Sequence, residues 1–180
     1  MISRSTTAGK NVELREAFDH TYAIPAASQA EQMENLLSIC VAGDRYAIRV
    51  SEISGLVNER KTVALPSRVP ELLGVACIRG GLVPVYSLAA LLGYSQDPGR
   101  TRWLALCRSE EPVGLAFSDF EGYLRVPVSQ VYAAEQKDVT RAYLKDLLCV
   151  ADIVRAVVSV PSLVEMIKRR CDQNRATKER

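Results

Sequence analysis

A series of short apolar runs separated by turns extends along most of the chain and restricts it to a mainly β fold. The runs occupy residues 36–42, 46–50, 53–57, 72–78, 82–86, 102–107, 113–117, 123–128, 147–152 and 156–160. Short runs of this kind, bounded by turn residues, are typical of the strands of β-barrels and β-sandwiches. Gly43, Asp44 and Arg45 separate the first two runs, which predicts a turn between antiparallel strands.

Helical signals are confined to two places in this β-rich region. Ser87 can cap a short helix that continues to Leu92. Near the C-terminus, Ser162 and Glu165 have the spacing of a capping box, which predicts the start of a second helix. The apolar residues of that second helix fall on one face: Leu163, Met166, Ile167 and Cys171.

The chain has 180 residues, which favours one compact domain with flanking segments. Residues 1–33 are polar and irregular, and we interpret them as an N-terminal extension that is partly helical or disordered. We expect the folded domain to occupy residues 34–170. Residues 171–180 are polar and basic, and we interpret them as a solvated tail.

The charge of the chain gives no sign of a nucleic-acid or membrane partner. Lys and Arg total 23 against 21 Asp and Glu, a formal net charge of +2, which provides no strong field to attract polyanions. No apolar run approaches the roughly 20 residues that a spanning helix needs, and the N-terminus lacks the apolar block of a secretory signal. We therefore expect a cytoplasmic protein that binds no nucleic acid and does not insert into a membrane.

The cysteines are far apart in sequence and form no CxxC pair. They are Cys40, Cys77, Cys107, Cys149 and Cys171, and all but the last lie in apolar runs. Small buried hydrophobic residues in a reducing compartment explain this distribution better than a metal site or a disulfide framework.

Recognisable catalytic machinery is missing from the sequence. The single histidine, His20, lies in the extension, which argues against histidine-centred catalysis and a His-ligated zinc. There is no phosphate-binding P-loop, dinucleotide fingerprint, calcium loop or nucleophile elbow. The carboxylates are dispersed, and spacing alone pairs none of them. We expect no enzyme activity, no cofactor and no metal.

One segment carries a resemblance to a known family. Residues 72–88, LLGVACIRGGLVPVYSL, resemble the signature of the CheW family, in which a glycine and a valine precede an Asn-Leu-Arg-Gly turn. An apolar strand containing proline and a short helix follow that turn in the family. Residues 43–48 also resemble the first hairpin of the family, and residues 113–117 resemble its Gly-Leu-Val-Val strand. The likeness extends from about Leu36 to Met166.

The resemblance implies a fold and a role. The fold would be two five-stranded SH3-like β-barrels with a shared apolar core; residues 42–92 would build one barrel, and the ends of the chain would join the other. The role would be a non-catalytic adaptor in chemotaxis or a related motility pathway. Such an adaptor binds the regulatory domain of a CheA-type histidine kinase and the cytoplasmic hairpin tip of a chemoreceptor.

The resemblance also assigns candidate site residues. Arg79 and Gly80 correspond to the receptor-binding turn, and the arginine would fix the orientation of a receptor helix. Ile53, Gly55 and Gly74 correspond to kinase-contacting positions. Gly55 stands where the family has a glutamate, so a charge-assisted contact is lost there. Two more positions depart from the family pattern: Cys77 replaces the usual Asn, and Ser118 replaces a common Asp.

Two alternatives remain open at this point. A divergent relative that has lost kinase coupling, and acts as a decoy or assembly factor, would explain Gly55 and Cys77. A small enzyme could use Cys77 as a reactive thiol beside Arg79, because a neighbouring cation lowers the pKa of a thiol. Without the resemblance, Arg79 is an ordinary solvent-facing turn residue, Ile53 ordinary core, and Gly74 a residue with a local backbone role.

Overall fold

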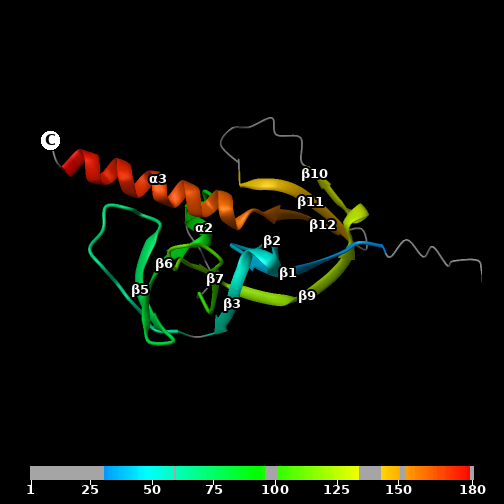
Figure 1. Ribbon diagram of the computed structural model, residues 1–180, viewed down its shortest axis with the longest axis horizontal. Helices are drawn as coiled ribbons and strands as arrows, with labels where there is room; N and C mark the ends of the chain where they lie inside the picture. Colours follow the sequence, from blue (N-terminus) through cyan, green and yellow to red (C-terminus); the bar gives the residue numbers. More distant parts are fainter. Residues whose placement is uncertain (1–30, 59, 96–100, 134–142, 151–152, 179–180) are drawn as a thin grey trace, which may run out of the picture. The chain divides into compact units, whose positions relative to one another are not determined.

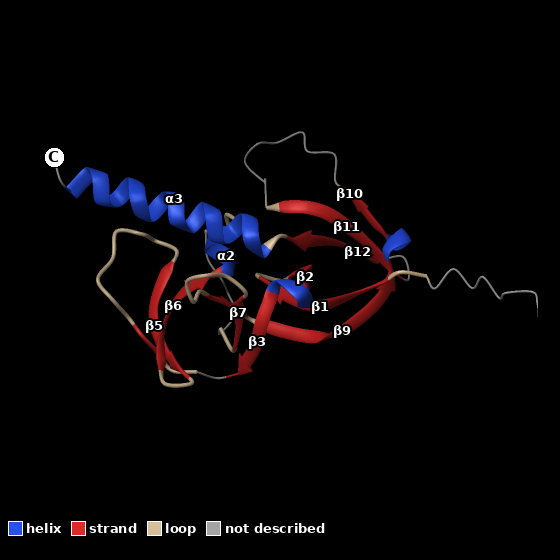
Figure 2. Cartoon of the chain, viewed as in Figure 1, coloured by secondary structure: helices blue, strands red, loops and turns tan. Residues whose placement is uncertain are grey.

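A computed structural model describes residues 31–58, 60–95, 101–133, 143–150 and 153–178 (Figure 1). The chain divides into two units, residues 1–32 and 33–180, and all helices and strands discussed below belong to the second. The expected N-terminal extension, including His20, lies almost entirely outside the described residues. Strands dominate the described part, with few helical segments (Figure 2).

Strands from the two ends of the folded unit build the first sheet, which we call sheet A. Its strands are β1 (Met33–Val41), β2 (Asp44–Arg49), β9 (Asp119–Pro127), β10 (Val131–Ala133), β11 (Leu144–Val150) and β12 (Ile153–Val158). Their order is β10-β11-β12-β2-β1-β9. All neighbouring strands are antiparallel except β12 and β2, which are parallel. This parallel pair joins the strands from the late part of the chain to the β1–β2 hairpin.

The middle of the chain builds the second sheet, sheet B. Its strands are β3 (Ile53–Asn58), β4 (Thr62–Val63), β5 (Leu72–Ile78), β6 (Gly81–Ser87), β7 (Trp103–Cys107) and β8 (Gly114–Phe117). Their order is β3-β7-β8-β6-β5-β4, and the pairing of β6 with β8 is the parallel one. The mainly β fold with two sheet subdomains is therefore confirmed. Each sheet has six described strands, not the expected five, because each includes a strand of two or three residues, β4 or β10, at an edge.

The division of the chain between the two sheets differs from the expectation that residues 42–92 form one subdomain. Strand β2 pairs with β1 and β12 and so belongs to sheet A, whereas β7 and β8 complete sheet B. The reason is the turn between β1 and β2, which consists of Ala42 and Gly43 alone, with φ of 52° and 93°. A two-residue turn of this type forces the flanking strands to pair. Asp44 and Arg45, expected in the turn, already lie in β2.

Two α-helices and two short 3-10 turns complete the described elements: α2 (Leu88–Leu91), α3 (Val160–Lys178), η1 (Val50–Glu52) and η2 (Val128–Gln130). The predicted cap of the first helix is confirmed, because the backbone N–H of Ala90 donates to Oγ of Ser87 over 3.2 Å. The long helix α3 continues through residues 171–178, which we had assigned to the tail.

The predicted capping box of α3 is wrong. The helix begins two residues before Ser162, at Val160, whose backbone N–H donates to Oε2 of Glu52 over 2.7 Å. Glu52 thus satisfies one of the free donors that every helix start exposes. Glu165 instead pairs with Arg169 one helical turn later, at 2.6 Å.

The largest cluster of the core joins both sheets to α3. Its fully buried members include Leu37, Ile48, Leu88, Phe117 and Leu163. A second cluster fills the interior of sheet B, and a third, around Leu36 and Leu148, fills the interior of sheet A. Strands β7 and β8 are buried on both faces, which explains why their runs in the sequence are continuously apolar.

The prediction that the cysteines are buried is wrong for part of the set. Cys107 is buried, and burial raises the pKa of its thiol to about 12. Cys77 and Cys149, by contrast, are exposed, because they occupy outward positions of β5 and β11. All the cysteines are free.

Candidate functional site

Arg79 and Gly80 form the two-residue turn between β5 and β6. Ile78 pairs with Gly81 across the turn, and φ is 50° at Arg79 and 82° at Gly80. These values match a hairpin turn whose two central residues both have positive φ. Ala42 has the same conformation in the β1–β2 turn, so the positive φ is a property of this turn type. The turn holds the arginine exposed at the end of a rigid hairpin.

The side chain of Arg79 lies against Gly55 of strand β3. A Cβ atom built on Gly55 would lie 3.9 Å from Nη2 of Arg79 and 3.8 Å from Cδ1 of Leu106. The fold therefore brings together two candidate residues that the family resemblance assigns to different partners. Among the described residues, Arg79 has no ion pair, so its charge is uncompensated at this position.

Gly55 has room for a side chain. Both contacts of the added Cβ are at ordinary van der Waals distance, and the backbone of Gly55 needs no left-handed conformation. The register of β3 and β7 shifts between Ile53 and Gly55, which marks a bulge beside the glycine. A carboxylate at position 55 could consequently reach the guanidinium of Arg79 without displacing the backbone.

Gly74, in contrast, has a local structural role. Its φ is 141°, and an added Cβ would lie 2.0 Å from the carbonyl oxygen of Val63. Strand β4 therefore packs directly on the backbone of this glycine, which is buried. The close approach of two backbones is a known reason for glycine in a strand. Gly74 can shape the neighbouring surface but offers no group of its own to a partner.

Ile53 belongs to the core that joins the two sheets. Its exposed fraction is 6%, too small for a side-chain contact at the surface. Its carbonyl oxygen accepts a hydrogen bond from Nη2 of Arg108 over 3.4 Å. Of the predicted kinase-contacting residues, only Gly55 thus has its side-chain position beside the Arg79 turn.

An exposed apolar patch adjoins this turn, and sequence reasoning missed it. The register of β4, β5 and β6 places its members on the outer face of sheet B: Val63, Val75, Cys77, Leu82 and Pro84. Leu82 is 70% exposed and Val63 57% exposed. Strands β5 and β6 have apolar residues on both faces. Such a run predicts that both faces are buried, so the sequence does not reveal that one face is exposed. The sequence does contain one signal of the patch. Cys77 and Leu82 are each two residues from the Arg79–Gly80 turn, so they pair across the hairpin and lie on the same face.

Several charged side chains of sheet A pair with one another in networks. Nε of Arg49 lies 2.5 Å from Oε1 of Glu34, and Nη2 lies 2.5 Å from Oδ2 of Asp146. Burial alone would lower the pKa of Arg49, but its hydrogen bonds to Asp146 and Glu34 outweigh burial and raise it. Burial raises the pKa of Glu52, although the N–H of Val160 and the charge of Arg49 oppose the shift.

A second network in sheet A is centred on Glu121. Its carboxylate accepts from Oγ of Ser38 over 2.7 Å and pairs with Nε of Arg45 at 3.1 Å and with Nη2 of Arg155 at 3.7 Å. Arg155 is 9% exposed, and its Nε has no hydrogen-bond partner. The network ties four strands of sheet A together.

The described residues contain no group of three or more His, Cys, Asp or Glu side chains that could hold a metal ion. In the same part of the chain, none of the helices is long and apolar enough to cross a membrane.

Comparison with known proteins places the chain in a family. No curated protein matches the sequence. The fold is similar to the crystal structure of the scaffolding protein TtCheW from Thermoanaerobacter tengcongensis, with a TM-score of 0.65 and 12% sequence identity. That similarity covers 72% of this chain and 90% of the other. The sequence matches the CheW-like domain family over residues 35–168, most of its length. On this match the chain belongs to the CheW-like domain family.

Proposed function

We propose that this protein is a signalling adaptor that couples chemoreceptors to a CheA-type histidine kinase, in chemotaxis or a related motility pathway. It would act in the cytoplasm, against the receptor hairpin tips. Membership in a family of non-catalytic scaffold proteins means that the chain is not an enzyme, which sets aside the reactive-cysteine alternative. The single observation that carries the proposal is the exposed Arg79–Gly80 turn, displayed at the end of a rigid hairpin in a chain of this family.

On the receptor side, Arg79 supplies an exposed charge that no described carboxylate neutralises. A guanidinium forms directional, bidentate hydrogen bonds with carboxylates, so it can fix how a receptor helix lies on the surface. Gly80 supports this role because a residue with φ of 82° keeps the turn tight.

On the kinase side, the structure favours surface shape over a charged contact. Gly74 allows β4 to lie close to β5 and so supports the exposed apolar patch that includes Val63 and Leu82. Ile53 anchors β3 in the core and thereby positions Gly55 at the surface. Apolar contact of this kind can dominate an interface when it is shape-complementary.

A second candidate function rests on Gly55. The carboxylate expected there is missing, and Arg79 beside it has no ion pair among the described residues. A family member that had lost its kinase contact, and served as a decoy or assembly factor, would have a glycine in place of the glutamate at this position.

Calorimetric titration with the regulatory domain of the CheA-type kinase from the same organism separates the two candidates. We expect the native protein to bind near micromolar affinity, about −8 kcal/mol. A glutamate introduced at position 55 would also lie near Arg79, so the matched variants are Gly55→Glu and the uncharged Gly55→Gln. If the native protein does not bind but Gly55→Glu alone does, the second candidate is correct. If none of the three binds, kinase coupling is rejected.

A further inference from the structure

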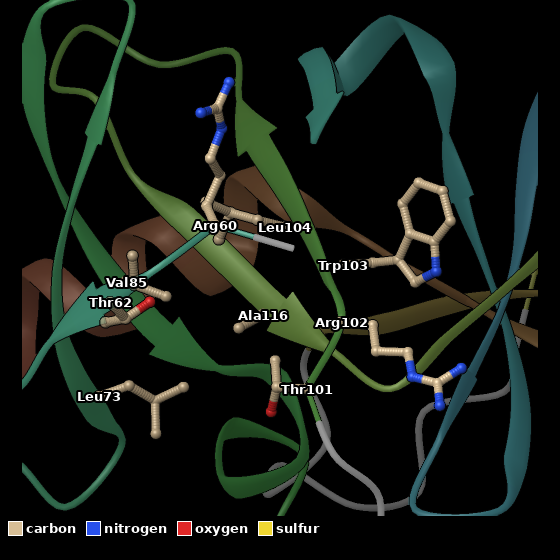
Figure 3. Close-up of a pocket in the computed structure, with 9 residues that line it drawn as sticks. All are labelled: Arg60, Thr62, Leu73, Val85, Thr101, Arg102, Trp103, Leu104 and Ala116. Carbon is tan, nitrogen blue, oxygen red and sulfur yellow. The ribbon is translucent and has the colours of Figure 1, made fainter. Parts of the chain in front are cut away.

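The strand register places a pocket at the end of sheet B opposite the Arg79 turn. Figure 3 shows the residues that line it. Its volume is about 240 Å³. Its floor is formed by interior-facing side chains of β4, β6, β7 and β8: Thr62, Val85, Leu104 and Ala116. Leu73 closes one side, and Arg60, Thr101, Arg102 and Trp103 stand at the rim.

The pocket exists because small side chains occupy positions where the interior of a sheet is normally filled. Ala116 faces Leu104 across the β7–β8 ladder, and Thr62 faces Ala76 across the β4–β5 ladder. Protein interiors are close-packed, and voids larger than a water molecule are few. An open hollow at the end of a sheet, lined by both apolar and polar side chains, therefore indicates a place that another group can fill.

The rim of the pocket is positively charged. Arg60 and Arg102 are both exposed, and neither has an ion pair with any described residue. Among the residues that the structure describes, the lining includes no Asp or Glu. In Figure 3 the guanidinium groups of Arg60 and Arg102 extend away from Ala116 on different sides. Charge complementarity thus favours an occupant with an apolar centre and negative charges around it.

We propose that the pocket docks one aromatic side chain of a partner protein, flanked by acidic residues that pair with Arg60 and Arg102. The pocket is smaller than the roughly 300–1,000 Å³ typical of small-molecule sites, and one large side chain fills it. Aromatic anchors in desolvated pockets, surrounded by a polar rim, are the usual centres of protein interfaces. The contact is separate from the Arg79 turn, so it adds a docking site to the proposed adaptor role without depending on it.

A peptide that carries only these features tests the proposal. The probe is an acetylated, amidated pentapeptide with a central tryptophan and two acidic residues on each side. Methyl NMR spectra of the full chain would follow the signals of Leu73, Val85, Leu104 and Ala116 during its titration. Two control peptides replace the tryptophan by alanine or all four acidic residues by lysine. We expect saturable shifts at the pocket methyls with the first peptide and at least tenfold weaker binding with each control.

Protein variants locate the binding. Ala116→Leu fills the floor and should abolish the shifts. Because a buried enlargement can disturb packing, Arg60→Glu combined with Arg102→Glu provides an independent test at exposed positions. The double variant should weaken binding at least tenfold, whereas Arg125→Glu, at an exposed position of β9 in sheet A, should not change it.

Three results would overturn the proposal. Shifts confined to residues outside the pocket, or no shifts at all, would show that the pocket is not a docking site. If the alanine peptide binds as tightly as the tryptophan peptide, the binding comes from surface charge and not from an aromatic side chain in the pocket. Tighter binding of free indole-3-acetate than of the peptide, with the same pocket shifts, would identify a small aromatic acid as the occupant instead of a protein side chain.

Discussion

The two sheets of this protein differ in where they place their charged residues. The strands of sheet A contain acidic residues (Glu34, Asp44, Asp119, Glu121, Asp146) and basic residues (Arg45, Arg49, Arg125, Lys145, Arg155). The strands of sheet B contain no Asp, Glu, Lys or Arg. The described charged residues around sheet B lie outside its strands, and one of them, Glu71, pairs with Arg170 of helix α3. Two sheets of similar size and layout thus have opposite electrostatic designs.

This contrast separates structural charges from available ones. In sheet A, Arg49 and Glu121 are centres of ion networks that connect strands, and their side chains are 19% and 30% exposed. Around sheet B, Arg60, Arg79 and Arg102 are exposed and unpaired among the described residues. Charges that already have partners stabilise the fold, whereas free arginines on an apolar scaffold are suited to recognition.

The largest effect expected from breaking this design is on the apolar framework of sheet B. Gly74→Ala would place a Cβ 2.0 Å from the carbonyl oxygen of Val63 at a φ of 141°, so β4 must separate from β5. We expect a loss of at least about 3 kcal/mol in unfolding free energy, from strain and lost packing together. Chemical denaturation monitored by circular dichroism measures it.

The matched control is Gly80→Ala. This glycine also has positive φ, 82°, but nothing lies within 4 Å of the added Cβ. Only the conformational cost remains, about 1 kcal/mol. Equal losses in the two variants would contradict the close contact between β4 and Gly74.

The networks of sheet A should be more sensitive to arginine loss than sheet B. Arg49→Met would leave the half-buried carboxylates of Glu34 and Asp146 without their cation. We expect destabilisation of about 2–3 kcal/mol, because unpaired carboxylates away from water are costly. Arg102→Met should change stability by less than about 0.5 kcal/mol. If the two variants lose similar amounts of unfolding free energy, the arginines of sheet A and sheet B do not differ in structural role.

A smaller effect on stability is expected when a carboxylate is introduced into a strand of sheet B. Gly55→Glu should pair with Arg79, because the Cβ position lies 3.9 Å from Nη2. A partly exposed ion pair contributes about 0.2–1 kcal/mol. A double-mutant cycle with Arg79→Gln isolates that coupling, and it should shrink in high salt. A coupling of zero would mean that the two side chains do not meet.

The smallest change concerns the pH dependence of Glu52. Burial raises the folded-state pKa of this carboxyl above its unfolded value, so the folded protein binds this proton more tightly. The resulting stability is fully present below the unfolded pKa and is lost as pH rises through the folded pKa. Glu52→Gln should therefore gain stability relative to the native protein as pH rises above the unfolded pKa of a glutamate, about 4.3. If Glu52→Gln instead loses stability relative to the native protein as pH rises, the pKa of Glu52 is lowered by folding and not raised.

Local sequence signals predicted the elements that depend on neighbouring residues. The Arg79–Gly80 turn, the Ser87 cap and the apolar face of the last helix follow from short-range rules, and the structure has all three. The resemblance of residues 72–88 added the family and the fold, which composition and spacing alone did not supply.

Long-range contacts could not be predicted in the same way. Glu52 caps helix α3 from 108 residues away, so no local pattern reveals that the helix begins before Ser162. The proximity of Gly55 and Arg79, and the contact of Val63 with Gly74, depend on how strands pair across sheet B. The same pairing decides that Ile53 is core and that Cys77 is exposed.

The most direct test of the account compares Arg79→Glu with Arg125→Glu in binding to a soluble chemoreceptor hairpin tip from the same organism. Both arginines are exposed, and neither has an ion pair among the described residues, but only Arg79 lies beside sheet B. The account predicts that Arg79→Glu weakens receptor binding at least tenfold with unchanged folding, and that Arg125→Glu binds like the native protein. Equal binding by the two folded variants would contradict the claim that the free arginine of sheet B recognises the receptor.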